Sequence, residues 1–189
     1  MDRVFAADAA SQAGRPHDKA ASETAHRGMV NALVRAALGD RPVFVTRDAA
    51  SWLDAGLRPV PQGLAFRIAT DGSDAPQELP HWGFRPERAS RDMQGALTCE
   101  LYARSALDRA YYEVSRGRDS TALDYLEYAR SFDPGWRTTG AVPWGARQVL
   151  ARSLAFFDAL RELDLDRLRG QAERAGLMAA PADSGAVGR

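Results

Sequence analysis

Two short apolar runs between residues 41 and 68 constrain the fold of this chain more than any other feature. Val43 to Val45 are β-branched or aromatic and follow Pro42, which a strand tolerates as its first residue although proline lacks a ladder donor. Leu64 to Ile68 carry large apolar side chains at every second position. The pattern predicts two strands.

A short helix is predicted between these strands. Asp48 is its expected N-cap, because a carboxylate oxygen can accept a hydrogen bond from a free amide in the turn Ala49 to Leu53. Gly56 lies where a left-handed C-terminal residue is expected. Upstream, apolar residues from Thr24 to Leu38 repeat at helical spacing, and we expect Gly39 to end that helix beside the sheet.

Four further apolar stripes at helical spacing predict four helices in the second half of the chain: residues 91–116, about 120–132, 145–163 and 165–175. Their expected N-caps are polar residues directly upstream: Ser90, Asp119 or Ser120, and Asp164. Glu127 and Arg130 predict an intrahelical pair on a solvated face that includes Asp124 and Asp133.

The sequence as a whole predicts a mostly helical α+β protein, in which a small two-stranded strand-helix-strand unit precedes antiparallel helical pairs. The expected divisions are a disordered tail (1–22), a small α/β unit (23–70), a loop or linker (71–90), a helical domain (91–176) and a loose tail (177–189).

Charge and composition exclude several classes of function. Lysine plus arginine number 25 and aspartate plus glutamate also 25, which argues against a nucleic-acid partner or attraction to an anionic membrane. The single cysteine, Cys99, excludes an internal disulfide and predicts a small buried side chain. The sequence has no secretory apolar core and no apolar run near 18 residues, so we expect a cytoplasmic protein without direct membrane insertion.

The segment Ala106 to Pro134 resembles one tetratricopeptide repeat, a family in which two antiparallel helices meet through small residues and a proline closes the second helix. The matching residues are Ala110, Tyr111, Ala122, Leu126, Ala129 and Pro134. No second copy follows at the family spacing of about 34 residues. The resemblance implies one pair docked on its neighbours, with a groove between helical pairs for a peptide or partner helix.

The order of elements from roughly Met29 to Pro134 resembles the C-terminal soluble region of multi-spanning bacterial membrane proteins related to protein O-mannosyltransferases. The matching residues are Arg41 to Thr46, Gly56, Leu57, Pro61 and Gly63 to Arg67. The membrane portion with its catalytic carboxylate has no counterpart in this sequence, so no catalytic residue is transferred. The resemblance implies a protein partner, with a multi-spanning membrane protein as one candidate. It also makes the extracytoplasmic face the alternative location.

Two groups of residues are candidates for contact with a ligand or partner. Trp82, Phe84 and Arg85 form an aromatic and basic cluster in the proline-rich loop, where the rings either pin the loop to the core or form a binding lip. Thr46, Arg47 and Asp48 follow the first strand, where helix amides can bind an anion unless Asp48 itself occupies them as a cap.

Two functions from different classes follow. The first is a non-enzymatic accessory or protein–protein interaction domain that uses the helical groove, associated with a membrane glycosyltransferase system. The second is the soluble acceptor- or sugar-handling part of a glycosyl-transfer enzyme, with Trp82, Phe84 and Arg85 contacting acceptor or sugar. A folded remnant with little function is a third hypothesis. No phosphate loop, Rossmann fingerprint or Gly-x-Ser-x-Gly elbow is present, and no catalytic residue, metal site or cofactor is predicted.

Overall fold

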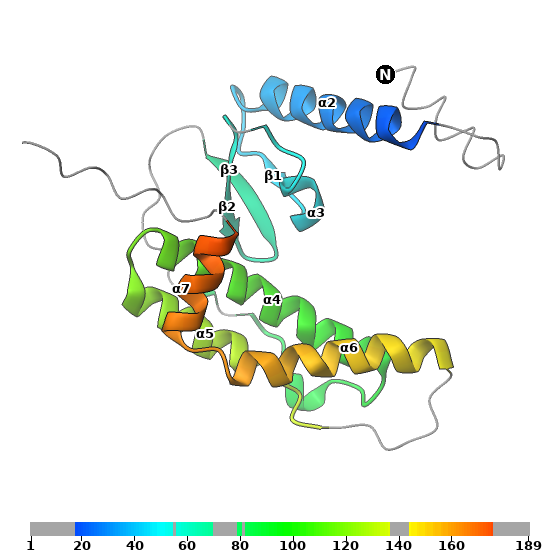
Figure 1. The fold of residues 1–189 in the computed structure, drawn as a ribbon, viewed down its shortest axis with the longest axis vertical. Helices are drawn as coiled ribbons and strands as arrows, with labels where there is room; N and C mark the ends of the chain where they lie inside the picture. Colours follow the sequence, from blue (N-terminus) through cyan, green and yellow to red (C-terminus); the bar gives the residue numbers. More distant parts are fainter. Residues whose placement is uncertain (1–17, 55, 70–78, 81, 137–143, 176–189) are drawn as a thin grey trace, which may run out of the picture. The chain divides into compact units, whose positions relative to one another are not determined.

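The computed structural model describes residues 18–54, 56–69, 79–80, 82–136 and 144–175. The chain divides between Asp74 and Ala75 into two compact units, each described here by itself (Figure 1). The predicted tails at residues 1–17 and 177–189 lie outside the described residues, as does much of the predicted linker. The predicted fold class is confirmed: a small antiparallel sheet is followed by packed helices.

The first unit contains a three-stranded antiparallel sheet, one strand more than the sequence predicts. The strands are β1 (Phe44–Val45), β2 (Arg58–Gln62) and β3 (Ala65–Ala69), in the order β1-β3-β2. The two predicted strands correspond to β1 and β3. The prediction missed β2 because Pro59 and Pro61 argue against a strand, yet proline is tolerated at a sheet edge, which is where β2 lies.

The register of the sheet is fixed by a hairpin on one side and a short ladder on the other. β2 and β3 are joined by a two-residue loop that begins with Gly63 at φ 62°, a conformation glycine adopts without strain. On the other side Phe44 lies opposite Arg67, and the Ile68 N–H donates to the Val43 carbonyl at 2.9 Å.

Helix α2 (Lys19–Ala37) begins earlier than the predicted Thr24. The reason is its cap: the Asp18 carboxylate accepts a hydrogen bond from the Ala21 N–H at 3.0 Å. The prediction of a disordered tail is therefore wrong for residues 19–22, which are helical.

Helix α3 (Arg47–Ala50) is displaced from the predicted Ala49 to Leu53. It closes at Ser51, whose hydroxyl donates to the Asp48 carbonyl at 2.6 Å. The prediction of a left-handed Gly56 is wrong, because the glycines with positive φ in the described residues are others. The helix has already ended before Gly56, so no left-handed C-terminal residue is needed there.

A hydrogen-bonded asparagine joins α2 to the segment after α3. The described residues of the first unit include five buried apolar side chains, Val34, Leu57, Val60, Ile68 and Ala69, of which Val34, Leu57 and Ile68 form one cluster. Beside it the buried Asn31 amide donates to the Trp52 carbonyl at 2.9 Å and accepts from the Asp54 N–H at 2.8 Å. Both backbone groups are thus satisfied by one side chain, which holds the loop on the helix.

The second unit is a group of helices arranged around one long helix. Its elements are η1 (Pro86–Arg88), α4 (Met93–Ser115), α5 (Asp119–Arg130), α6 (Trp144–Arg161) and α7 (Leu165–Arg174). Helices α5, α6 and α7 each pack on α4. Figure 1 shows α7 turning away from the axis of α6, and both helices pack mainly on α4 rather than on each other.

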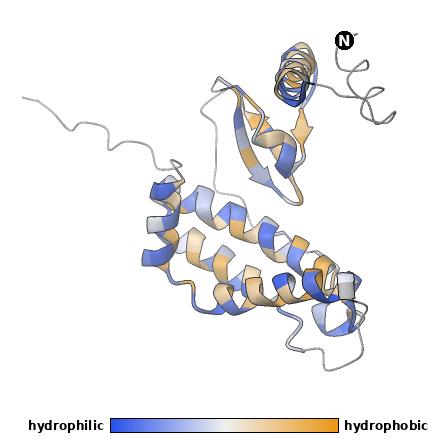
Figure 2. Cartoon of the chain, turned by 45° about the vertical axis from the view of Figure 1, so that its right-hand side comes forward, coloured by the Kyte–Doolittle hydropathy of each residue, from blue (hydrophilic) through white to orange (hydrophobic). Residues whose placement is uncertain are grey.

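Helices α4 and α5 form an antiparallel pair that meets through alanines. Several alanines of the pair are each only 0% or 1% exposed, including Ala103, Ala106, Ala110, Ala122 and Ala129. Gly117, at φ 70°, allows the tight turn between the helices. Small residues let the two backbones approach closely, as the sequence predicts. In Figure 2 the helices alternate between hydrophobic and hydrophilic residues, as expected for helices that bury one side.

The predicted cap of α4 is wrong by two residues. Asp92, and not Ser90, is the N-cap: its carboxylate accepts from the Gly95 N–H at 2.8 Å, and the Ser90 hydroxyl donates to the same carboxylate at 2.8 Å. The preceding chain crosses close to Gly95, because a Cβ added there would lie 1.9 Å from the Ser90 carbonyl oxygen. This close approach fixes where the helix begins.

The remaining predicted caps give one correction and one confirmation. Arg118 occupies the N-cap position of α5, in place of the predicted Asp119 or Ser120, and makes no side-chain cap bond there. Its N–H instead donates to the Glu113 carbonyl at 3.0 Å, so the turn that ends α4 also starts α5. Asp164 is the N-cap of α7, as predicted.

Cys99 is fully buried in the core of the helical unit, as predicted. Burial raises the pKa of its thiol to about 11. The side chain therefore stays protonated at neutral pH and acts as a small apolar residue.

Candidate functional site

Trp82 and Phe84 pack into a cluster of aromatic rings from α4, α5 and the residues directly after α5. The rings of Phe84 and Tyr102 are stacked at 4.6 Å between centroids. The Trp82 ring lies 5.1 Å from Tyr102 and 5.4 Å from both Tyr128 and Phe132. Aromatic pairs of this geometry are each worth about 0.5–1.5 kcal/mol beyond the area that they bury. The rings therefore hold the segment before η1 against the helices.

A tyrosine hydroxyl adds a polar contact to this cluster. The Tyr128 hydroxyl donates to the Pro80 carbonyl and accepts from the backbone N–H of Trp82 at 3.5 Å. Burial raises the pKa of Tyr128, which keeps the hydroxyl protonated as a donor. Arg85, at the N-cap position of η1, is the exposed member of the predicted group. Contact of Trp82, Phe84 and Arg85 with a sugar, acceptor or partner stays a prediction.

The second predicted group, Thr46, Arg47 and Asp48, is exposed at the start of α3. Thr46, and not Asp48, is the N-cap: its hydroxyl accepts from the Ala49 N–H at 3.4 Å. The reason is that the extended chain leaving β1 places Thr46 over the first free amide, while Asp48 already lies in the first turn. A helix of four residues has little macrodipole, so this geometry favours a structural role for the group.

Among the described residues, the most buried carboxylate belongs to Glu113, in a cluster that the sequence analysis missed. Its side chain is 0% exposed; one oxygen accepts from Arg109 Nε at 2.5 Å and the other from Arg118 Nε. The Arg109 guanidinium also lies 5.0 Å from the Tyr112 ring and 6.0 Å from the Tyr125 ring. Because both carboxylate oxygens bind guanidinium groups, the cluster joins the end of α4 to the start of α5.

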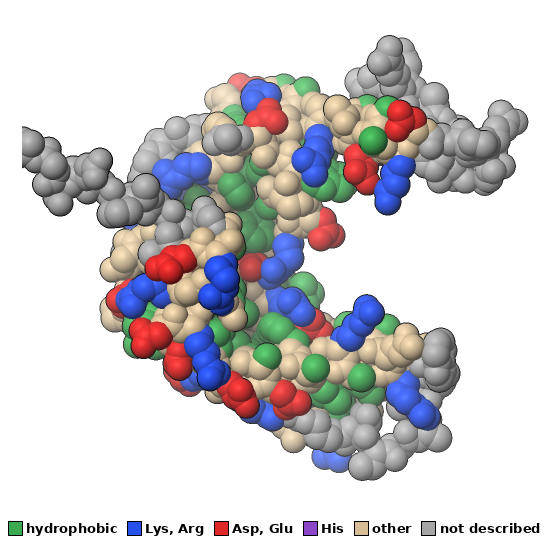
Figure 3. Space-filling view, viewed as in Figure 1, with side chains coloured by type: hydrophobic (Ala, Val, Ile, Leu, Met, Phe, Trp, Pro, Cys, Tyr) green, Lys and Arg blue, Asp and Glu red, His purple; other side chains and the backbone are tan. Residues whose placement is uncertain are grey.

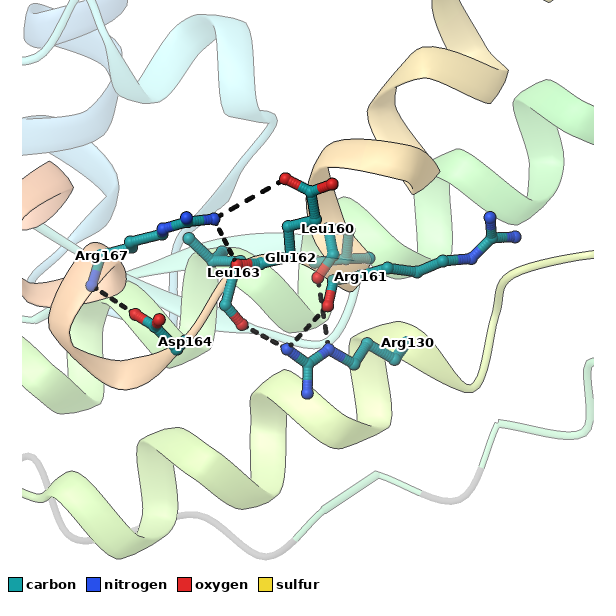
Figure 4. Close-up of polar contacts among 7 residues, drawn as sticks. All are labelled: Arg130, Leu160, Arg161, Glu162, Leu163, Asp164 and Arg167. Atoms are coloured by element: carbon teal, nitrogen blue, oxygen red, sulfur yellow. Dashed lines mark hydrogen bonds and ion pairs between the residues drawn. The ribbon is translucent and has the colours of Figure 1, made fainter.

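A further arginine, Arg130, fixes the corner between α6 and α7 (Figure 4). The Arg130 guanidinium, from α5, donates to the backbone carbonyls of Leu160 at 3.2 Å, Arg161 at 3.4 Å and Leu163. The last carbonyls of a helix have no partner within it, and a cation there is favoured by the helix dipole. Arg130 therefore caps the C-terminus of α6.

This arrangement corrects the predicted solvated face of α5. The predicted pair of Glu127 with Arg130 is confirmed, but the Arg130 side chain is only 27% exposed. Asp133 is 14% exposed and pairs with Arg161. Both residues face α6 rather than water, because the corner after α6 packs on the end of α5, while Asp124 is exposed.

Large apolar side chains are exposed on three helices of the second unit. Leu101 on α4 is 52% exposed, Leu123 on α5 is 40% and Val149 on α6 is 37%. Leu101 lies about 200° around the helix from the buried Ala103 and next to an ion pair between Glu100 and Arg104. Figure 3 shows hydrophobic side chains among charged ones on the visible surface of α6.

Comparison with known proteins gives no matching family model, curated protein or solved structure. The likenesses to a tetratricopeptide repeat and to membrane mannosyltransferase relatives therefore stay predictions. In the part of the chain that the structure describes, no three His, Cys, Asp or Glu side chains are grouped as metal ligands, and no helix is long and apolar enough to cross a membrane.

Proposed function

We propose that this protein is a non-enzymatic accessory or protein–protein interaction domain, whose helical unit binds a protein partner. The observation that carries the proposal is the exposure of Leu101, Leu123 and Val149 on three different helices. An ion pair between Glu100 and Arg104 flanks Leu101, and an apolar side chain bordered by charges is the arrangement of an interface core with a polar rim.

The packing of the unit supports this proposal. An alanine-lined pair with α6 and α7 on α4 is a rigid support, and the polar contacts of Glu113 and Arg130 fix its two turns. A surface held in one geometry before binding loses less conformational freedom on association. The partner favoured by the sequence resemblance is a multi-spanning membrane protein of a glycosyl-transfer system.

The test is affinity capture with the tagged full chain, from detergent-solubilised membranes and separately from soluble extract of the native cells. The wild-type chain should recover one protein in stoichiometric amount. A double variant, Leu101→Glu with Leu123→Glu, should lose that protein by at least about tenfold, because burial of a charge at the interface is costly.

The matched control is Leu33→Glu, which changes a leucine of the first unit that is 59% exposed. It should leave recovery unchanged. Recovery of a membrane protein would identify the glycosyl-transfer partner, while recovery of a soluble protein would indicate an independent interaction domain. Stoichiometric recovery from neither fraction, or recovery insensitive to the double variant, would refute the proposal.

A further inference from the structure

The two edges of the sheet differ in the backbone groups that they expose. The Ile68 N–H donates to the Val43 carbonyl, so the backbone groups of Ile68 and Phe66 face β1. Pro59 lies opposite Ile68 and Pro61 opposite Phe66 on the other side. The nitrogens and carbonyls of both prolines therefore point outward, and neither proline can donate a hydrogen bond to an added strand.

The β1 edge is protected less, because only one of its outward positions, Pro42, is a proline. Phe44 lies opposite Arg67, whose backbone groups face β2, so the N–H and C=O of Phe44 point outward. No backbone hydrogen bond among the described residues uses either group, and the Phe44 side chain is 51% exposed. Pro42 and Thr46, two positions away on each side, are also exposed. An aromatic strand edge of this kind is a template for pairing with another strand.

We propose that β1 pairs antiparallel with β1 of a second copy of this chain, about a two-fold axis at Phe44. In that register the Phe44 N–H of each copy donates to the Phe44 carbonyl of the other. The next outward pair joins the Thr46 N–H of one copy to the Pro42 carbonyl of the other. The contact is isologous, as two-fold dimers require.

Pro42 has no N–H to donate in this pairing, and the carbonyl that it would face, that of Thr46, already has a donor within its own chain. In a regular ladder residue 42 would donate to the Thr46 carbonyl of the second copy, but Pro42 has no N–H. The Thr46 carbonyl already accepts from the Ala50 N–H at 2.9 Å. Every polar backbone group that the pairing buries thus has a partner. This complementarity depends on the sequence being paired with itself, so it favours a second copy over an unrelated peptide.

Side chains and the outer edges agree with a closed dimer. The two Phe44 rings lie directly across from each other on one face, where aromatic cross-strand pairs are favourable. The resulting sheet runs β2-β3-β1 and then β1-β3-β2 of the second copy. Both of its new outer edges are β2 strands with Pro59 and Pro61, so assembly stops at the dimer.

The first test is sedimentation velocity of the full chain from micromolar to millimolar concentration. The wild-type chain should form a dimer as concentration rises. Phe44→Pro should weaken it at least about tenfold, because it removes both symmetric donors. The internal ladder is kept, since the Phe44 N–H does not face β3, and circular dichroism should show unchanged folding. The control Leu64→Ser, at an exposed residue of the β2–β3 loop, should not alter the dimer.

The second test locates the axis. Across a hydrogen-bonded antiparallel pair, Cα atoms lie about 5.5 Å apart, a separation that a disulfide can bridge. Mild oxidation of the Phe44→Cys variant should give a covalent dimer, whereas Leu33→Cys should not, and the buried Cys99 does not compete. A monomer at every concentration, a dimer unaffected by Phe44→Pro, or equal cross-linking of the two cysteine variants would overturn the proposal.

Discussion

Replacement of Glu113 by glutamine tests whether the turn between α4 and α5 depends on a buried ion cluster. The carboxylate is 0% exposed and binds two guanidinium groups, Arg109 Nε at 2.5 Å and Arg118 Nε. Glutamine keeps the volume of the side chain but retains only one acceptor oxygen. Its NH₂ group must face one of the arginines, so that a buried cation loses both its hydrogen bond and its counter-charge.

The expected loss is about 3–5 kcal/mol of unfolding free energy. Removal of one partner from a buried ion pair costs about that much, because the remaining charge is left uncompensated. The same range follows from the loss of one or two charge-assisted hydrogen bonds at about 1.5–3 kcal/mol each. Typical domains have a total stability of about 5–15 kcal/mol, so the variant should be close to unfolding at physiological temperature.

Urea denaturation followed by far-ultraviolet circular dichroism measures this loss, because most of the helical signal comes from the second unit. The matched control is Glu127→Gln, in which the same chemical change removes an ion pair whose carboxylate is 68% exposed. Surface pairs contribute about 0–1 kcal/mol, so the control should remain near wild type. If both variants lose less than about 1 kcal/mol, the reasoning about burial is wrong.

Three further outcomes are expected. Gly95→Ala should lower the free energy of unfolding in urea by about 1–3 kcal/mol, because its Cβ would lie 1.9 Å from a backbone oxygen. Gly28→Ala, whose Cβ would have nothing within 4 Å, should instead raise that free energy by about 0.5–1 kcal/mol. Burial raises the pKa of the Cys99 thiol from 9.0 to about 11. The stability that the protonated thiol contributes should therefore be complete below pH 9.0 and should be lost as pH rises through about 11. Urea midpoints compared across that range should show this loss in the wild type and not in Cys99→Ala. Asn31→Ala should lower the free energy of unfolding by about 2 kcal/mol, because it leaves the Trp52 carbonyl and the Asp54 N–H without their partner. Thermal melting measures this loss, and an unchanged melting temperature would contradict the role of Asn31.

The helices could be predicted from sequence because a buried side imposes a period that local residues display. Their caps were less predictable, since Ser90, Asp92 and Asp48 are all good cap residues and the path of the preceding chain selects among them. Strand β2 was missed for a different reason. The bounds of β2 are set by its hydrogen bonds to β3, which the sequence does not show. Its prolines indicate an edge strand only once that pairing is known.

The candidate residues show the same limit. Composition identified Trp82 and Phe84, but their ring partners come from α4 and α5, far along the chain. The spacing of Arg109 and Glu113 is visible as an i, i+4 pair, but sequence alone gives no sign that the pair is buried. Arg130 has the clearest local signal, its pair with Glu127, and its contacts with the end of α6 depend on tertiary packing.

A single repeat-like pair of helices can be stable here because its open sides are covered by unlike helices rather than by further repeats. In an array each pair covers the next, and the terminal pairs need a polar outer side. In this chain α6 and α7 both pack on α4, and Arg130 satisfies the carbonyls at the corner where α6 ends. The pair is thus covered by unlike helices of its own chain, and we propose that the exposed leucines of α4 and α5 contact a protein partner.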